Sequence, residues 1–424
     1  MSMKKTVYLV GVAILLIAIV GLFGCSKKDA TAKQGAGVET LPTQEAEAKE
    51  EITGSKSQKE YFKEAEKAFK RAKVAPASDF VYGLADSGDG VVIKKYQEKE
   101  IFAEIIIPAE IEGLPVVELA ERAFSGSSVK TVVVPDSITR FANFLFSEAQ
   151  SLKYVKLPSS MTSIPYSCFS SCKSLEYFEI PPHITNIEKD AFVGSGLRKI
   201  EIPSTVTSFQ TPSIHKTGEY NDSSNLFFRC KNLEYVKLPN TMKVIGMGTF
   251  SLCDNLKQVV LPETLEIIEE RAFDSCRNLE QIDIPETVVS IGYNALRKTG
   301  LTSLVIPESV TDCADLQLGT CDNLESLTLP NSVTHIKKSL LYTENSRTKK
   351  LKSVNLPAFL QKIDDGAFYG LSSLEELIIP ENLISIEFSQ NIRIEEKNNA
   401  FYGTSLPLSI QAKLKQLGYP GEFN

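Results

Sequence analysis

Eight cysteines and three histidines are the residues of this sequence best suited to chemistry. Thiols and imidazoles can form disulfides, bind zinc, or act together as a nucleophile and its base. Five of the cysteines share one spacing, because each lies nine residues before a proline; they are Cys172, Cys230, Cys253, Cys276 and Cys321. A position that recurs at a fixed distance indicates a structural role, so we interpret these side chains as one inward-facing column.

Two further cysteines also fit a packing role. Cys168 occupies the place that alanine holds in other repeats, and Cys313 the place that isoleucine holds. A buried free cysteine behaves as a small apolar side chain, which accounts for all seven thiols after Cys25. A strained disulfide among Cys230, Cys253 and Cys276 is the alternative, because these three fall on adjacent repeats.

The histidines do not complete a reactive site. A zinc site built from Cys168, Cys172 and His183 lacks the ligand spacings usual for that metal. His215 and His335 share no repeat level with an exposed cysteine that they could activate as a base. We therefore expect no metal, no cofactor and no catalytic residues, and we predict that the chain is not an enzyme. An enzyme acting on surface glycans is the alternative, and it would need two close carboxylates in a cleft.

The spacing of the cysteines belongs to a repeat of about 23 residues that covers nearly all of 100–405. The unit reads L-x-x-I-x-I-P-x-x-V-x-x-I-x-x-x-A-F-x-x-C. Its prolines are Pro108, Pro135, Pro158, Pro181, Pro203, Pro239, Pro262, Pro285, Pro307, Pro330, Pro357 and Pro380. The alternation L-x-x-I-x-I predicts a strand with one buried face, which the proline ends, and V-x-x-I predicts a second short strand edge.

A large apolar residue recurs eleven residues after most of these prolines. The column is Phe124, Phe146, Phe169, Phe192, Phe227, Phe250, Phe273, Leu296, Leu318, Leu341, Phe368 and Phe401. A unit this short cannot bury its own apolar face, so it must stack on its neighbours. The pattern predicts a β-rich solenoid, a curved parallel sheet of about twelve coils with this column as its spine.

These units resemble the leucine-rich repeat of BspA-like bacterial surface proteins. The segments DGVVIKKY (89–96) and IIIPAEIEGLPVVELAERAF (105–124) are similar to the first coil of that family. The resemblance implies a leucine-rich repeat solenoid in an exported or surface protein. It also implies, for some members of the family, an adhesin that binds host matrix proteins.

The N-terminus predicts export. Lys4 and Lys5 precede an apolar run over 7–23, and Gly24 stands directly before Cys25. The junction resembles a lipoprotein signal, so we expect 1–25 to be a signal peptide that ends at a lipidated Cys25. An uncleaved transmembrane anchor is the alternative. The prediction places the protein in a bacterial envelope, at the outer membrane or cell surface in preference to the inner membrane.

Residues 26–58 contain almost no large apolar side chains and are predicted to form a flexible tether. An amphipathic helix is predicted within 59–78, ending before Pro76, with apolar residues at helical spacing: Phe62, Ala65, Phe69 and Ala72. We expect this helix to pack on the start of the main domain, and a partner-binding helix is the alternative.

The repeats are expected to form a solenoid over 79–405, and 406–424 is predicted to cap it. Ile410, Leu414 and Leu417 fall on one helical face, and Gly418 suits the end of that helix. A solenoid needs such a cap to cover its last coil.

A partner-binding face is predicted on the outward side of the strands. Tyrosines and charges that precede the prolines should line one open, concave sheet: Tyr154, Lys156, Tyr177, Glu179, Lys199, Glu201, Tyr235 and Lys237. Tyrosine gives broad contact with a polar tip, which suits protein recognition, although it also favours strands in general. The insertions at 210–225 and 388–399 are a second candidate for specificity or simple decoration.

The sequence therefore predicts a lipid-anchored surface protein that binds an unknown protein partner, with host extracellular matrix the first candidate, through its concave sheet. The formal net charge of −7 argues against a nucleic-acid partner, which usually meets a basic surface. The alternative is a periplasm-facing envelope scaffold with no adhesion role.

Overall fold

The chain divides into two units, Met1–Ser55 and Lys56–Asn424. The computed structural model describes residues of the second unit only: 57–97, 103–209, 225–311, 313, 316–343, 346–347, 350–383, 385–388 and 400–423. The predicted signal peptide with Cys25, nearly all of the tether, and almost all of both insertions lie outside the described residues. Among the described residues, no helix is both long enough and apolar enough to span a bilayer.

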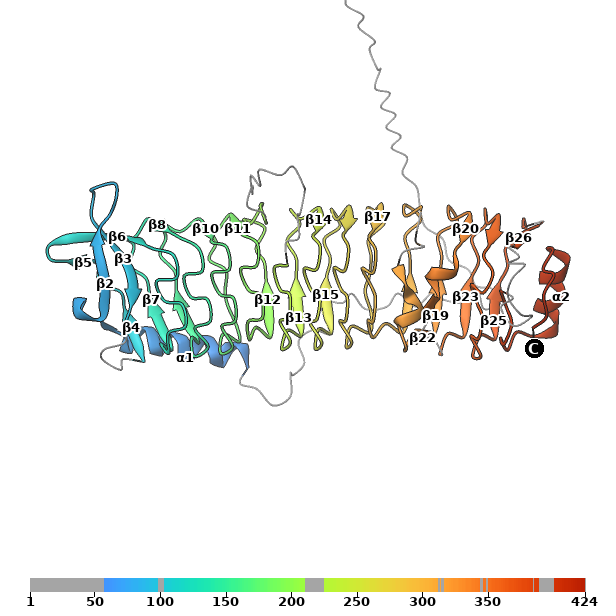
Figure 1. Ribbon diagram of the computed structural model, residues 1–424, viewed down its shortest axis with the longest axis horizontal. Helices are drawn as coiled ribbons and strands as arrows, with labels where there is room; N and C mark the ends of the chain where they lie inside the picture. Colours follow the sequence, from blue (N-terminus) through green and yellow to red (C-terminus); the bar gives the residue numbers. More distant parts are fainter. Residues whose placement is uncertain are drawn as a thin grey trace, which may run out of the picture. The chain divides into compact units, whose positions relative to one another are not determined.

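The second unit is a parallel β-solenoid of about 11 turns of about 23 residues, which confirms the predicted architecture. The coils stack side by side along one long axis (Figure 1). The first ladder begins with β1 (Lys73–Val74), which lies before the repeats and pairs with the first repeat strand. The L-x-x-I-x-I segments continue it in three groups: β4 (Glu104–Ile106), β7 (Thr131–Val133) and β9 (Tyr154–Lys156); β12 (Lys199–Glu201), β13 (Tyr235–Lys237) and β15 (Gln258–Val260); and β18 (Ser303–Val305), β19 (Ser326–Thr328), β23 (Ser353–Asn355) and β25 (Glu376–Ile378).

A second ladder follows the prolines, where V-x-x-I was predicted to make a further strand edge. Its strands are β10 (Ser163–Ile164) and β11 (Asn186–Ile187), then β14 (Val244–Ile245), β16 (Ile267–Ile268) and β17 (Ser290–Ile291), then β20 (His335–Ile336), β24 (Lys362–Ile363) and β26 (Glu387–Phe388). In both ladders each residue pairs with the residue at the same place in the next coil, as Val236 pairs with Val259. A constant register places like side chains in columns along the solenoid.

The N-terminal end adds a mixed sheet in the order β2–β3–β6–β5, with β8 beside β6. Its strands are β2 (Phe80–Leu84), β3 (Val91–Tyr96), β5 (Glu110–Ile111), β6 (Leu114–Leu119) and β8 (Arg140–Phe141). The remaining short elements are the 3-10 turns η1 (Ala77–Asp79), η3 (Leu318–Thr320) and η4 (Lys338–Leu340), and the antiparallel pair β21 (Tyr342–Thr343) and β22 (Ser346–Arg347).

The predicted aromatic spine is confirmed. Every member of the column is buried, and rings of adjacent coils stack at 5.2–5.7 Å between centroids from Phe124 to Phe273. Leucines continue the column at Leu296, Leu318 and Leu341, and the rings resume with Phe368 against Phe401. The column also makes backbone hydrogen bonds between coils: the Phe250 amide, for example, donates to the Ala272 carbonyl at 2.8 Å. Stacking therefore buries the rings and satisfies the backbone beside them.

The cysteine column is a ladder of thiol–carbonyl hydrogen bonds. All seven described cysteines are buried free thiols, which confirms the packing interpretation. Each thiol of the column donates to a spine carbonyl of the preceding coil: Cys172 to Phe146 (3.1 Å), Cys230 to Phe192 (3.0 Å), Cys253 to Phe227 (3.1 Å), Cys276 to Phe250 (3.2 Å) and Cys321 to Leu296 (3.2 Å). A thiol at this corner is small enough to be buried, and it supplies a second, weak donor to a carbonyl that also accepts from a backbone amide of the following turn.

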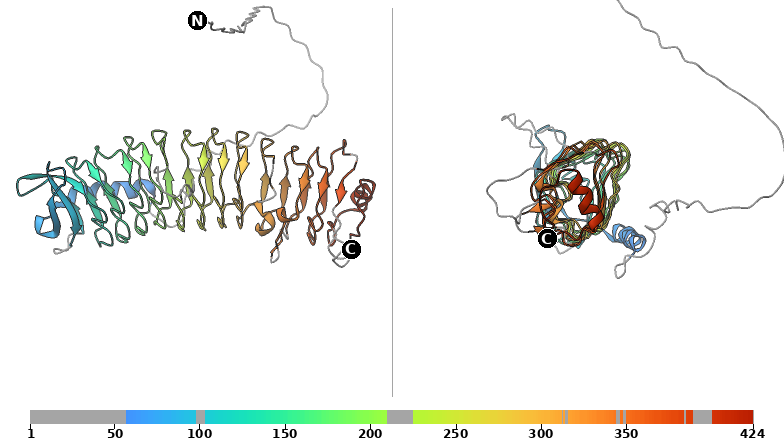
Figure 2. Two further views of the ribbon diagram at one scale, coloured as in Figure 1. Left: turned by 45° about the horizontal axis from the view of Figure 1, so that its top comes forward. Right: turned by 90° about the vertical axis from the view of Figure 1, so that its right-hand side faces the viewer.

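The C-terminal cap is confirmed as α2 (Leu408–Gln416), which follows Pro407 and ends before Gly418. Leu414 is fully buried, and the Ile386 amide donates to the Leu417 carbonyl at 2.9 Å. The helix lies across the end of the last coil (Figure 2), so the final apolar layer is shielded from water.

The first helix, α1 (Gln58–Arg71), is shorter than predicted. Ser57 and Glu60 form a reciprocal capping box at its start. After Arg71 the chain becomes extended, and Lys73–Val74 pairs in parallel with Ile105–Ile106 of β4. Backbone pairing with the first coil ends the helix before Pro76 does, so the first ladder begins ahead of the predicted boundary at 79.

We expect Phe250→Ala to lower the free energy of unfolding by about 3–5 kcal/mol, because it removes a fully buried ring and leaves a cavity between two stacked neighbours. Urea unfolding followed by circular dichroism measures the loss. Val305→Ala is the control, since Val305 is 61% exposed and should change stability by less than about 0.5 kcal/mol. Equal losses of unfolding free energy for the two substitutions would contradict the conclusion that the aromatic spine stabilises the solenoid.

We expect the buried thiols to be unreactive in the native chain. Burial raises the pKa of the Cys230 thiol to about 11 and that of Cys253 well above its usual value. The reactive thiolate is therefore scarce at pH 8 and becomes abundant only above the raised pKa. A chain starting at residue 26 should give no colour with an aromatic disulfide reagent at pH 8 until urea is added. Rapid labelling in native buffer would show that the column is open to solvent.

Candidate partner-binding face

The eight residues predicted to bind a partner lie in four successive coils. Three of these coils contain β9, β12 and β13, and the fourth, which carries Tyr177 and Glu179, lies between β9 and β12. The structure divides them into two groups, because α1 lies along the first ladder beside the N-terminal coils (Figures 1 and 2). Tyr154 is 8% exposed and Tyr177 is 3% exposed, since both pack against this helix. The expectation that these two tyrosines line an open sheet is therefore wrong, while the expectation that the helix packs on the main domain is confirmed.

Tyr61 of α1 is the anchor of this contact. Its ring centroid lies 4.8 Å from that of Tyr154 and 5.0 Å from that of Tyr177, edge to face with both. Its hydroxyl donates to the Lys153 carbonyl. The Tyr154 hydroxyl donates in turn to the Glu64 carboxylate at 3.3 Å. Such aromatic pairs add roughly 0.5–1.5 kcal/mol each beyond the area they bury.

An ion pair holds the other end of the helix. The Arg71 guanidinium donates twice to the Glu104 carboxylate, at 2.6 and 3.0 Å, in a forked arrangement. This pair is largely exposed, so it orients the helix more than it stabilises it.

The tyrosine hydroxyls at this contact stay protonated. Burial, with a smaller contribution from Glu64, raises the pKa of Tyr154 to about 12. Burial raises the pKa of Tyr61 further, and Tyr154 adds to that effect. The two hydroxyls therefore keep their protons at neutral pH and remain available as hydrogen-bond donors.

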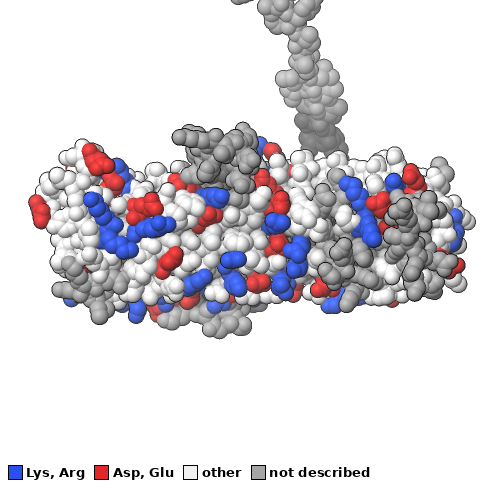
Figure 3. Space-filling model, in the orientation of Figure 1, with Lys and Arg blue, Asp and Glu red and all other residues white. Residues whose placement is uncertain are grey.

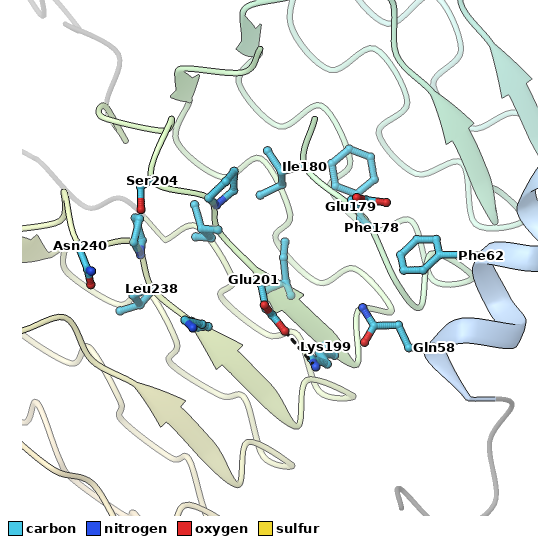
Figure 4. Close-up of a pocket in the computed structure, with 15 residues that line it drawn as sticks. Gln58, Phe62, Phe178, Glu179, Ile180, Lys199, Glu201, Ser204, Leu238 and Asn240 are labelled. Atoms are coloured by element: carbon cyan, nitrogen blue, oxygen red, sulfur yellow. Dashed lines mark ion pairs between the residues drawn. The ribbon is translucent and has the colours of Figure 1, made fainter. Parts of the chain in front are cut away.

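The second group of predicted residues lines an open groove of about 610 Å³ beside the N-terminal end of α1. Figure 4 shows Lys199 and Glu201 on β12, with Gln58 and Phe62 of the helix on one side. Lys199 and Glu201 form an ion pair at 3.0 Å, and the Lys199 ammonium lies 4.7 Å from the centre of the Tyr235 ring. Strands hold these side chains in a fixed arrangement, so the groove presents both charges on a rigid floor.

Four of the eight predicted residues are brought together here, namely Glu179, Lys199, Glu201 and Lys237. Tyr235 is half-buried beside Lys199, and Lys156 is exposed on β9, where it lines a smaller cavity next to α1. Apolar walls complete the groove with Phe178, Ile180 and Leu238. The sequence prediction missed Gln58 and Phe62, because nothing in the local pattern of 57–72 says where that helix docks.

Charge on the face is mixed. Figure 3 shows basic and acidic side chains interspersed over the side that carries β12, β13 and β15. Beside these strands Arg198 pairs with Glu234, and Glu234 also pairs with Lys257 of the next coil at 3.0 Å. A surface of alternating sign matches a polar protein surface better than a polyanion.

Within the described part of the chain, no three His, Cys, Asp or Glu side chains are grouped as metal ligands. Cys168 and Cys172 lie in the core, where burial raises the pKa of both thiols. His335 contacts Asp364 at 2.7 Å on the second ladder, away from the groove.

Comparison with known proteins adds to this picture. The family model described as "BspA type Leucine rich repeat region (6 copies)" matches residues 95–218, 223–347 and 343–417. A leucine-rich repeat protein from Bacteroides ovatus is similar in structure, at 22% identity and a TM-score of 0.56, over 82% of this chain and 99% of that one. A leucine-rich cell surface protein from Faecalibacterium prausnitzii also matches at 22% identity, with a TM-score of 0.39, over 77% and 97% of the two chains. No curated protein matches the chain.

We expect Tyr61→Ala to release α1 from the sheet, because it removes the ring that fills the space between two tyrosines. Trypsin should then cut at the lysines of α1 at least tenfold faster, since a change of about 1.4 kcal/mol in docking already shifts the open population tenfold. Tyr61→Phe is the matched control: it keeps the ring and loses the hydrogen bond to Lys153. Cleavage of the alanine variant at the wild-type rate would contradict the anchoring role.

Proposed function

Because this chain belongs to the BspA-type leucine-rich repeat family, whose model matches well over half of its residues, we propose that it is a protein-binding scaffold held at the bacterial envelope by a lipid on Cys25. The family is typically protein-binding, and its members are repeat scaffolds that are not known as enzymes. The solenoid supplies the rigidity that a recognition surface needs, because each coil is fixed by both of its neighbours.

The observation that carries the proposal is the groove beside α1. It combines apolar walls with one cation and one anion set 3.0 Å apart on a strand. A partner side chain can bury apolar surface against the partly buried Phe62 while its polar end replaces water around Lys199 or Glu201. Partly buried apolar and charged groups in one concave site are typical of the residues that dominate protein–protein affinity.

Adhesion to host or neighbouring-cell proteins is the finer part of the proposal, with host extracellular matrix as the first partner to test. It rests on the implied behaviour of the family and on an export signal that ends at Cys25. The alternative is a scaffold that faces the periplasm. It would use the same groove, but it would lie inside the outer membrane and not on the cell surface. We place the protein at the outer membrane or cell surface.

We expect the double substitution Lys199→Glu with Lys237→Glu to weaken binding to immobilised host matrix extract about 30-fold or more, which corresponds to about 2 kcal/mol. Reversing both charges removes the cations of the groove floor and leaves the core untouched. Surface plasmon resonance measures the change on a chain that retains α1, because Gln58 and Phe62 form one wall of the groove.

The matched control is Lys350→Glu with Lys352→Glu, a double charge reversal on exposed side chains near β23, several coils away. It should bind like the wild type. Equal weakening by both double variants would show that binding responds to the net charge of the chain and not to the groove. A wild-type chain that binds no matrix component would end the adhesion proposal and favour the periplasmic scaffold.

We expect Cys25→Ala to abolish incorporation of a radiolabelled fatty acid and to move the protein from the membrane fraction to the soluble fraction. Proteinase treatment of intact cells then tests display, because a protein on the outer surface is degraded while one facing the periplasm is spared. Retention of the label after the substitution would refute lipidation at Cys25. Protection of the wild-type chain on intact cells would refute surface display.

A further inference from the structure

We infer that the solvent-facing side of α1 binds an anionic membrane surface, with lysine ammonium groups against the phosphates of lipid headgroups. We call this surface the lysine face; its residues are Lys59, Lys63, Lys67 and Lys70. The helix stays docked on the sheet, as the structure has it. The inference goes beyond the proposed groove and stands on other residues, so each can fail without the other.

The lysine face lies opposite the docked side of α1. Three buried residues make the docked side: Tyr61, Ala65 and Ala68. Because a helix turns by about 100° per residue, the four lysines fall on the opposite side, and all four are exposed. Figure 2 shows in its right-hand view that α1 stands outside the stacked coils. From Lys59 to Lys70 the charges extend over about 16 Å of helix.

The helix itself does not balance this charge. Among the described residues, none of the four ammonium groups forms an ion pair. Two of the three glutamates of α1 serve other contacts, since Glu60 accepts from the Ser57 amide and Glu64 from the Tyr154 hydroxyl. Glu66 is the third, so one carboxylate stands among four cations. Lysines four residues apart repel one another, and an external anionic surface relieves that repulsion.

A pocket beside the helix can hold a headgroup phosphate. It is an open surface pocket of about 420 Å³, lined by Glu64, Lys67, Arg71, Lys153 and Tyr154. Lys67 belongs to the lysine face, so the pocket is continuous with it. Arg71 is already paired with Glu104, which leaves Lys67 and Lys153 as the cations for a phosphate oxygen. The Lys153 ammonium is positioned over the Tyr154 ring, 5.3 Å from its centre.

The place of α1 in the chain favours a bilayer as the partner. This step rests on the proposed lipid at Cys25, which precedes Gln58 by 33 positions. The predicted tether between them would span roughly 30 Å, so an anchored chain would meet the headgroups at a high effective concentration. The whole chain has a net charge of −7, so an anionic surface attracts the lysine face and repels most of the remainder.

Membrane binding at the lysine face would control access to the groove. The groove opens beside the N-terminal end of α1, on the side of the first ladder that α1 covers. A bilayer resting along the helix would lie about one helix diameter, 10–12 Å, above that ladder. A gap of this width excludes a folded protein. Membrane binding and binding of a folded partner in the groove therefore exclude one another.

The test uses the chain 26–424, which carries no lipid, and phosphatidylcholine vesicles with or without about 30% phosphatidylglycerol. Sedimentation measures the bound fraction as a function of lipid concentration. We expect the wild-type chain to bind the anionic vesicles, to leave the neutral ones free, and to be released when salt is raised from about 0.05 to 0.5 M. Replacing all four lysines of the lysine face by glutamine should weaken binding at least tenfold, because each lysine near an anionic surface contributes about fivefold.

The matched control removes the same charge from exposed lysines of coils that α1 does not cover: Lys231→Gln, Lys257→Gln, Lys298→Gln and Lys352→Gln. It should bind like the wild type. Glutamine is a good helix former, and circular dichroism checks that both variants fold.

Equal weakening of the two quadruple variants, equal binding to neutral vesicles, or no binding of the wild-type chain to anionic vesicles overturns the inference. Retention on immobilised heparin without vesicle binding also overturns it, because the partner is then an acidic polysaccharide. The tested chain carries no lipid and its groove is unaltered, so failure of lipidation at Cys25 or of groove binding would show in separate experiments.

Discussion

The structure depends on one constraint: a coil of about 23 residues cannot bury its own apolar face. From Phe124 to Phe273 each fully buried ring of the spine contacts the ring of the next coil, so stability is shared between neighbouring coils and not contained in any one unit. The thiol ladder has the same origin. At the buried corner between coils the Phe146 carbonyl accepts from the Ala149 amide and also from the Cys172 thiol, which is small enough to fit there.

Stacking also decides what the surface can do. Two parallel ladders hold side chains in columns at a constant register, so neighbouring coils present their outward residues side by side. Where α1 covers the first ladder, two tyrosines of one column, Tyr154 and Tyr177, become the binding site for a helix of the same chain. Where α1 ends, the same face opens into a groove with Lys199 and Glu201 on its floor. The extent of one helix along a regular scaffold therefore decides which part of this face is open to solvent.

Much of the fold could be predicted because its determinants are local and repeated. The strand before each proline, the buried Phe124-to-Phe401 column and the cap at Leu408–Gln416 all follow from periods of two, 23 and 3.6 residues. The candidate site could be predicted only in part. Glu179, Lys199, Glu201 and Lys237 do meet on one surface, but Tyr154 and Tyr177 were predicted to be open and are buried.

The sequence by itself determined the repeat, its inward columns and the thiols as packing groups, because the same residue types recur at the same positions in successive repeats. Only the tertiary structure decided which outward residues meet solvent. That outcome depends on contacts between residues far apart in the chain, such as the hydrogen bond from Tyr61 to Lys153 across 92 positions. A helix with an apolar face can dock against any complementary apolar surface. The spacing of its apolar residues predicts that face, but it does not predict which surface the helix contacts.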